Sequence, residues 1–312
     1  MPIWQFGPFY VNSPIDLSSL WEVCSENKPD INLTEVDTDL HAPSHAPSYE
    51  GLLQKVWVEE NSAGRRYHIS CNHGDAFAHF VIIPADKHIK FNTNNERGAL
   101  SLIQGVVLGS YLRIIGQLAL HANVLVRDGN AIAIAGQSGS GKSSLTCSLM
   151  KQGFKLLADD QFLFTFAHNG NVTAHFGRRK LRLWPDSVKY FDIDSQYCAL
   201  VYDEIEGFDK LEIFDPDLVT KTPTKVSAIY CLEPRSRSIR APQCQEVNGA
   251  EKLALLMKHR YGLIAPIGAA KKQEWIRLSK LADAISVFSV TMPDDMAGLS
   301  RHAQALFSKS VT

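Results

Sequence analysis

The stretch that decides the fold reads Ala131-Ile132-Ala133-Ile134-Ala135-Gly136-Gln137-Ser138-Gly139-Ser140-Gly141-Lys142-Ser143. Residues 136–143 fit the pattern G-x-x-x-x-G-K-[ST], in which small residues let the backbone wrap a phosphate with successive N–H groups pointing inward. Gly139 and Gly141 supply the positive φ values that such a path requires. The spacing predicts that Lys142 reaches the β- and γ-phosphates of a nucleoside triphosphate and that the Ser143 hydroxyl ligates Mg²⁺.

The sequence on either side of this loop fits a strand–loop–helix unit. The apolar run 131–135 predicts a buried strand, and residues 142–151 predict a helix whose N-terminal dipole favours a bound anion. The predicted phosphate-binding surface therefore consists of the loop and the first residues of the helix: Gly136, Gln137, Ser138, Gly139, Ser140, Gly141, Lys142, Ser143 and Ser144.

Residues 1–95 are expected to form a β-rich domain that serves either as a docking surface or for packing and assembly. Its strands are predicted at residues 5–11, 55–59, 66–70, 76–83 and 88–91. From Gly98 onwards apolar residues at helical spacing predict one long helix. Residues 96–312 then alternate strands and helices and end in mostly helical segments. The expected fold class is α/β, with a β-rich N-terminal domain and a helical C-terminal end.

The composition indicates a soluble globular protein, since 45% of the 312 residues are hydrophobic, 21% are charged and the net charge is −1. This balance argues against a nucleic-acid partner, which needs concentrated positive charge. The longest apolar stretch, residues 102–126, is interrupted by Gln104, Arg113, Gln117 and His121 and is too polar for a membrane span. The six cysteines are scattered, and no basic segment with an apolar core opens the chain. We therefore expect free thiols and a cytoplasmic location. A homo-oligomer is compatible with the sequence.

Two adjacent carboxylates follow the loop after one helix and one turn. Asp159 and Asp160 close the apolar segment 154–158, which predicts a strand next to the loop strand with its carboxyl end beside the phosphates. One carboxylate would hold Mg²⁺, and the other would take a proton from an incoming hydroxyl. The alternative is an Asp-rich turn that caps the strand.

His121 lies in an apolar segment just ahead of the loop strand. It is either a satisfied core residue or, if its strand neighbours the loop strand, a hydrogen-bond partner that shifts the pKa of a catalytic carboxylate. A basic cluster follows the acidic pair: Arg178, Arg179, Lys180 and Arg182. It is either a solvated turn or a source of positive charge for a transferring phosphoryl group.

Residues 120–160, LHANVLVRDGNAIAIAGQSGSGKSSLTCSLMKQGFKLLADD, resemble the catalytic core of the HPr kinase/phosphorylase family. The likeness lies in the combination of a His-containing strand, a turn, a P-loop, one helix and an Asp-Asp strand. It implies a P-loop fold related to phosphoenolpyruvate carboxykinase, ATP and Mg²⁺ as cofactors, and transfer to a serine hydroxyl. It also implies that Asp160 is the general base, that Asp159 assists with Mg²⁺ and that His121 supports the two carboxylates, while Lys142 and Ser143 serve the phosphates and the metal.

Two further segments resemble the HPr-kinase-like serine kinases of bacterial gene clusters, including those for lasso-peptide biosynthesis. They are residues 4–9 with 13–15, and the run Leu181-Arg182-Leu183-Trp184-Pro185-Asp186, which favours Arg182 as the arginine of the site. The glycine-rich signature that follows the Asp-Asp strand in HPr kinases has no clear counterpart here. The acceptor that this resemblance implies is therefore a protein or peptide other than HPr, and phosphorylase activity is not predicted.

Two other functions are compatible with the same motifs. A regulatory or scaffold protein would bind the nucleotide without turning it over, because a P-loop indicates binding and not turnover. A kinase for a small metabolite such as free serine would differ in its acceptor pocket, which the sequence does not reveal. The adjacent carboxylates favour phosphoryl transfer over binding alone.

Overall fold

The computed structural model describes residues 1–17, 22–24, 27–36, 40–51, 54–62, 64–73, 75–201 and 209–307. Contacts between Cα atoms divide them into two compact units. The first contains residues 1–117 and 262–273, and the second contains residues 118–201, 209–261 and 274–307. In the described part of the chain, no helix is long and apolar enough to cross a membrane.

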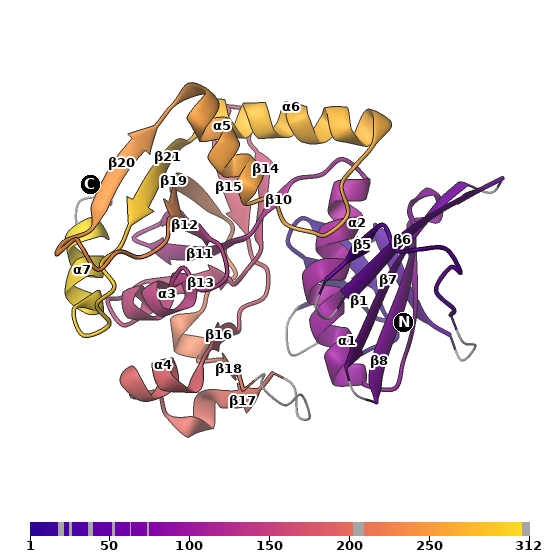
Figure 1. Cartoon of the computed structure of the whole chain (residues 1–312), viewed down its shortest axis with the longest axis horizontal. Helices are drawn as coiled ribbons and strands as arrows, with labels where there is room; N and C mark the ends of the chain where they lie inside the picture. Colours follow the sequence, from indigo (N-terminus) through magenta and orange to yellow (C-terminus); the bar gives the residue numbers. More distant parts are fainter. Residues whose placement is uncertain are drawn as a thin grey trace. The chain divides into compact units, whose positions relative to one another are not determined.

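The first unit is built on a nine-stranded sheet of order β3-β1-β2-β4-β9-β8-β7-β6-β5 (Figure 1). The predicted strand 5–11 is a hairpin of two strands, because Gly7 turns the chain with a φ of 57°. The other four predicted strands are present as β6 to β9. The strands are β1 (Ile3–Phe6), β2 (Phe9–Asn12), β3 (Glu22–Val23), β4 (Ile31–Glu35), β5 (Tyr49–Glu50), β6 (Gln54–Asn61), β7 (Gly64–His73), β8 (Ala76–Ile83) and β9 (His88–Thr93).

The predicted long helix also belongs to this unit, and it is broken into three segments. These are α1 (Glu96–Leu102), a π-helical turn (Ile103–Val107) and α2 (Leu108–Ile114), with a kink at Gly105. The sequence predicted a boundary at residue 95. The division between the two compact units instead follows Gln117. An amphipathic pattern shows that a helix buries one face, but it does not show which sheet that face covers.

A buried histidine pair connects β7 and β8. The Nδ1 of His68 lies 3.2 Å from the Nε2 of His79, and the two side chains are only 7% and 4% exposed. Burial, followed by the charges of His68 and His41, lowers the pKa of His79 to about 4. The His79 ring is therefore neutral in the folded protein at neutral pH.

This depressed pKa predicts a loss of stability in acid. An unfolded chain binds a proton at His79 near the ordinary pKa of 6.5. The contribution of His79 to the free energy of unfolding is therefore complete above that pH, and it is lost as the pH falls toward 4. We expect a loss of about 2–3 kcal/mol from this residue. Urea unfolding of wild type and His79→Gln between neutral pH and about pH 4 measures it. An identical pH dependence in both proteins would contradict the assignment.

The second unit contains another nine-stranded sheet, of order β10-β14-β15-β19-β12-β11-β13, in which β21 pairs with β19 and β20. A three-stranded sheet of order β16-β18-β17 lies in the same unit. The strands are β10 (Ala119–Leu120), β11 (Ala122–Arg127), β12 (Asn130–Gly136), β13 (Lys155–Ala158), β14 (Phe162–Phe166), β15 (Val172–His175), β16 (Leu181–Leu183), β17 (Cys198–Leu200), β18 (Leu211–Ile213), β19 (Thr224–Leu232), β20 (Gln243–Val247) and β21 (Ser286–Thr291).

Helices cover the two faces of the large sheet (Figure 1). One face packs with Leu256 and Leu278 of α5 and α6, and the other packs with Leu145 and Phe307 of α3 and α7. Because both faces are buried, β12 is apolar from Ala131 to Gly136 and shows no alternation there. The helices are α3 (Lys142–Met150), α4 (Pro185–Tyr190), α5 (Gly249–Lys258), α6 (Gly268–Ala284) and α7 (Leu299–Phe307), with short 3-10 turns at Pro84–Asp86, Ser195–Tyr197 and Pro216–Leu218.

The sequence predicted that β13, the strand of the acidic pair, lies next to the loop strand β12. This prediction is wrong, because β11 lies between them. The strands β11 and β12 form a hairpin whose two-residue turn, Asp128-Gly129, has φ values of 51° and 74°, as D-G turns favour. The hairpin places β11 beside β12, and β13 pairs with the outer edge of β11. The loop, His121 and the acidic pair still meet at one edge of the sheet, because β11 runs antiparallel to both neighbours.

Candidate functional site

The glycine-rich loop connects β12 to α3. The φ values of Gly139 and Gly141 are 83° and 91°, which confirms the predicted left-handed conformation. The N–H of Ser140 donates to the carbonyl of Gln137 at 3.1 Å and closes a turn. A Cβ at Gly136 would overlap the Ser140 hydroxyl and lie 3.2 Å from the Cβ of Leu232. The loop is therefore compact, and it requires glycine where it leaves the strand.

The lysine of the loop lies against the acidic pair. The Nζ of Lys142 donates to the Oδ1 of Asp160 at 2.5 Å and to the Oδ1 of Asn123 at 3.0 Å. The Lys142 side chain is only 7% exposed, whereas the Asp160 side chain is 28% exposed. The Nε2 of His121 lies 3.2 Å from the same carboxylate oxygen, Oδ1 of Asp160. The structure thus brings together three residues that the sequence analysis selected: Lys142, Asp160 and His121.

Arg178 connects the two carboxylates. Its Nη2 donates to the Oδ2 of Asp159 and, at 2.8 Å, to the Oδ2 of Asp160. The side chains of Arg178 and Asp159 are 3% and 1% exposed, so this ion pair is fully buried. A backbone bridge joins the same two residues, with the N–H of Asp159 donating to the carbonyl of Arg178 at 2.7 Å.

The environments of the two carboxyls shift their pKa values in opposite directions. Burial, followed by the neighbouring Asp160 charge, raises the pKa of Asp159, and Arg178 opposes this shift. Burial would also raise the pKa of Asp160, but Lys142, Arg178 and His121 together hold it well below its usual range. Asp160 is therefore ionised in this state of the protein. Divergent pKa values in an adjacent pair are typical of acid–base sites.

Asn123 is a further site residue that the sequence analysis missed. It is fully buried on β11, and its Nδ2 donates to the Thr146 hydroxyl at 3.0 Å. Its Oδ1 accepts from the Lys142 ammonium and, at 3.0 Å, from the backbone N–H of Asp160. Asp160 has a left-handed φ of 62°, which is uncommon outside glycine. Asn123 therefore holds the lysine and the strained backbone of the carboxylate in place. The available signal was an amide side chain inside an otherwise apolar strand.

Loss of the Asn123 amide is expected to destabilise the protein. In Asn123→Ala the buried N–H of Asp160 loses its acceptor, which costs about 1–3 kcal/mol. Urea unfolding measures the change, with Thr146→Val as the matched control, because that variant removes one partner of the amide and leaves both acceptor contacts of Oδ1. The account predicts a larger loss for Asn123→Ala than for Thr146→Val. Equal losses would show that the amide does not position Asp160.

No protein-family model matches the chain, and no curated protein matches it. Among solved structures, the HPr(Ser) kinase/phosphatase from Coxiella burnetii is similar, with 16% sequence identity and a TM-score of 0.27. The match covers 53% of this chain and 88% of that one. The relationship is a distant structural one, and at this TM-score no site or activity transfers from that protein to this chain.

Arg182, which the sequence analysis favoured, pairs with a different carboxylate. Its Nε and Nη2 donate to Glu212 at 3.1 and 2.9 Å, because the two residues face each other across β16 and β18. The same carboxylate, Glu212, also pairs with Lys180 at 3.5 Å. In this structure Arg178, and not Arg182, makes the hydrogen bonds to the acidic pair, and a role for Arg182 in phosphoryl transfer stays a prediction.

The two predicted Mg²⁺ ligands, Ser143 and Asp159, lie in different surroundings from each other, and so does Ser144, the last residue of the predicted phosphate-binding surface. Ser143 is half-buried at the start of α3, and the Ser144 hydroxyl lies 3.3 Å from that of Ser187. Asp159 is turned toward Arg178 and is almost inaccessible. In the described ranges, no group of three or more His, Cys, Asp or Glu side chains is placed to hold a metal. The assignment of Ser143 and Asp159 to Mg²⁺ stays a prediction.

Two further residues interact electrostatically with Asp160. The ring of Tyr261 lies 5.6 Å from that of His121, and burial, followed by the Asp160 charge, raises its pKa. The Lys210 ammonium lies 5.0 Å from the Trp184 ring. Burial lowers the pKa of Lys210, and the charges of the acidic pair oppose this shift. A phenol and an amine are therefore in electrostatic range of the carboxylate.

Proposed function

We propose that this chain is an ATP- and Mg²⁺-dependent kinase that transfers the γ-phosphoryl group to a serine or similar hydroxyl of a protein or peptide. The observation that supports this function most is the contact between the loop lysine and a carboxylate. Lys142 and Asp160 meet at 2.5 Å where β12 and β13 end. A phosphate-binding loop and a candidate proton acceptor thus share one edge of the sheet.

The residues of the loop fit a triphosphate. The left-handed glycines turn the backbone as a phosphate cradle requires, and the loop leads directly into α3, whose N-terminus favours an anion. The Ser140 hydroxyl is buried and has no hydrogen-bond partner among the described residues. Ser143, with phosphate oxygens as further ligands, would hold Mg²⁺, and the ion when bound neutralises charge on the phosphates.

The chemistry that these residues support is an in-line displacement. The acceptor oxygen forms a bond to the γ-phosphorus while the bond from that phosphorus to the β,γ-bridging oxygen breaks. The proton of the acceptor hydroxyl passes to a carboxylate oxygen of Asp160. Arg178 and His121 keep that carboxylate in position, and Lys142 compensates the charge of the phosphates.

The ion pair between Lys142 and Asp160 has a consequence for this role. A carboxylate with a strongly depressed pKa is a weak base. A bound triphosphate competes with Asp160 for the Lys142 ammonium, and loss of this contact raises the pKa of Asp160. Nucleotide binding therefore makes Asp160 a stronger base at the moment when an acceptor can react.

The more detailed assignments belong to the same proposal. The second unit, which contains residues 118–201 and 209–261, would be the catalytic domain with an HPr-kinase-like core. The β-rich first unit would dock the acceptor or support assembly. The cytoplasm, where ATP is available, is the proposed location. Homo-oligomerisation remains compatible with the proposal.

Two measurements test this function. Isothermal titration with Mg-ATP is expected to show one site in the wild type and none in Lys142→Ala. Mass spectrometry of serine-containing peptides incubated with the wild type and Mg-ATP is expected to show a phosphorylated serine. Binding without any transfer would instead support a regulatory protein, and transfer to free serine alone would support a metabolite kinase.

A further inference from the structure

The edge of the sheet that carries the loop continues beyond it, away from the acidic pair. Strands β12, β19 and β21 are parallel neighbours, so the segments that follow them emerge at the same edge. Those segments are residues 233–237 and 292–296. In open α/β sheets, ligands bind outside the carboxyl ends of the strands. The partners of Lys142 described above, Asn123 and Asp160, lie on the β11 and β13 side of the loop.

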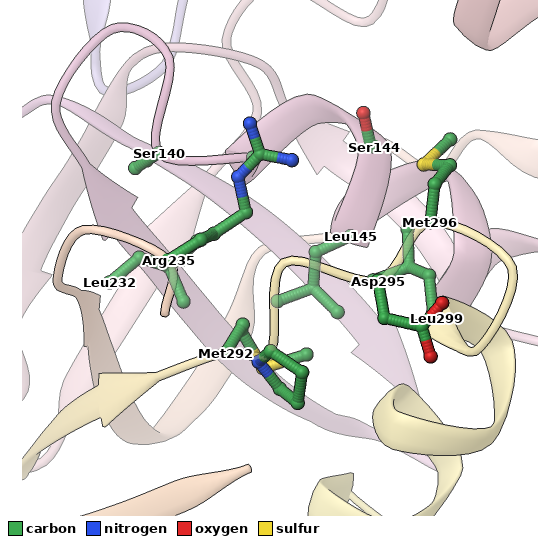
Figure 2. A pocket seen from close by; sticks show the side chains of 11 residues that line it. Ser140, Ser144, Leu145, Leu232, Arg235, Met292, Asp295, Met296 and Leu299 are labelled. Carbon is green, nitrogen blue, oxygen red and sulfur yellow. The ribbon is translucent and has the colours of Figure 1, made fainter. Parts of the chain in front are cut away.

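Two hollows lie between the loop and these segments. The smaller, of about 20 Å³, is lined by side chains of α3, α7 and the ends of β19 and β21 (Figure 2). The larger, of about 300 Å³, is lined by residues 137–140 of the loop together with Pro234, Lys258 and Asp294. Arg235 lines both hollows. In Figure 2 its side chain projects between Ser140 on one side and Leu145 and Met296 on the other.

The smaller hollow has a largely apolar wall, which suits a flat ring. Aliphatic and thioether side chains bury a ring well, and methionine adapts its shape to what it contacts. The wall contains Leu145, Leu232, Met292, Pro293, Met296 and Leu299.

Ser140, at the junction of the loop and the hollows, supplies a further sign that a polar ligand belongs here. It lines both hollows and is only 9% exposed, yet its hydroxyl has no hydrogen-bond partner among the described residues. Buried hydroxyls in native proteins are normally satisfied. A ligand with polar groups at the junction of the hollows would supply the missing partner.

Arg235 is placed to control access to this space. Its Cδ lies 3.6 Å from where a Cβ would stand on Gly141, so the side chain crosses the loop. It is 43% exposed and pairs with Asp294 at 3.2 Å, and exposed ion pairs of this kind contribute little to stability. The side chain can therefore move at small cost and enlarge the smaller hollow.

We propose that these hollows form the subsite for the nucleoside part of the triphosphate, with the base on the apolar wall beside Met296. This inference rests on the proposed function, which places the γ-phosphate beside Lys142 and Asp160. The nucleoside end of the chain of phosphates then leaves on the opposite side of the loop, where Arg235 stands. Arg235 covers the base, as a planar guanidinium can.

The test compares two ligands that differ in the nucleoside. Pyrophosphate carries only the phosphates that the loop holds, whereas ADP carries the ribose and base as well. In titration calorimetry with Mg²⁺, Arg235→Ala is expected to weaken ADP binding about tenfold and to change pyrophosphate binding less than about twofold. Met296→Trp, which fills the apolar wall, is expected to show the same selectivity.

Arg237→Ala is the matched control. Arg237 pairs with the same Asp294 at 3.1 Å but is 91% exposed and lines neither hollow. It is expected to leave both affinities unchanged, and circular dichroism checks that all variants are folded. If Arg235→Ala and Met296→Trp bind ADP as the wild type does, or lose both ligands equally, the subsite is refuted while the kinase proposal stands. A wild type that binds neither ligand refutes both.

Discussion

Asp160→Asn is expected to reduce phosphoryl transfer by about 100-fold or more, the usual contribution of a general base. The affinity for Mg-ATP is expected to stay the same or to increase. In the protein without nucleotide the Lys142 ammonium is bound to Asp160 at 2.5 Å, and the variant removes this competitor for the phosphates. Transfer rates at saturating ATP, together with titration calorimetry, separate the two effects.

Asp128→Asn is a matched control for this variant. This variant makes the same acid-to-amide change at an exposed turn, where Asp128 also has a left-handed φ. It is expected to transfer the phosphoryl group at the wild-type rate. A normal rate in Asp160→Asn would contradict the assignment of the base. A weakened ATP affinity with unchanged transfer would instead show that Asp160 serves binding.

Arg178→Met is expected to destabilise the protein by about 3–5 kcal/mol, the range found when one partner of a buried ion pair is removed. The reason is that Asp159 is 1% exposed and its Oδ1 already lacks a hydrogen-bond partner among the described residues. Without Arg178, the carboxylate would be buried with no charge partner on Oδ2. Urea unfolding monitored by circular dichroism measures the loss.

A double variant identifies the cause. Arg178→Met with Asp159→Asn removes the uncompensated charge, so it is expected to be more stable than Arg178→Met alone. Arg237→Met, at an exposed ion pair, is expected to have little effect. If the double variant is no more stable than Arg178→Met, the buried charge is not the cause of the loss.

The local elements of the second unit were readable from the sequence because their signals are local. The loop pattern 136–143, its left-handed glycines and the flanking strand and helix depend on neighbours in the chain. The contact of His121 with a carboxylate was one of two alternatives in the sequence, and it occurs because the hairpin at Asp128-Gly129 places β11 beside β12. The mixed α/β fold was predicted for the same reasons, and the observed strands and helices agree with it.

The choice between the two arginines was not readable, because it depends on pairing between distant segments. Arg178 forms a backbone bridge with Asp159, which carries its side chain to the acidic pair. Arg182 instead lies in β16 opposite Glu212 of β18, and a cross-strand pair of opposite charge is favourable. A sequence run of basic residues does not indicate which member faces which partner.

The position of β13 and the boundary between the units illustrate the same limit. The sequence shows that one helix and one turn separate the loop from the acidic pair, but the hairpin partner β11 takes the place beside β12. Asn123 was missed because an amide in an apolar strand indicates a buried hydrogen-bond partner but does not indicate which residue that partner is. Its role appears only when Lys142, Thr146 and the backbone of Asp160 converge on it.

The central claim is that the loop and Asp160 together move a γ-phosphoryl group to a hydroxyl. The most direct measurement follows isotope-labelled γ-phosphate from Mg-ATP into a serine-containing peptide library, detected by mass spectrometry. We expect labelled phosphoserine with the wild type and with Asp128→Asn, at least about 100-fold less of it with Asp160→Asn, and none with Lys142→Ala. Tight ATP binding by the wild type with no labelled peptide or protein, or equal labelling by Asp160→Asn, would contradict it.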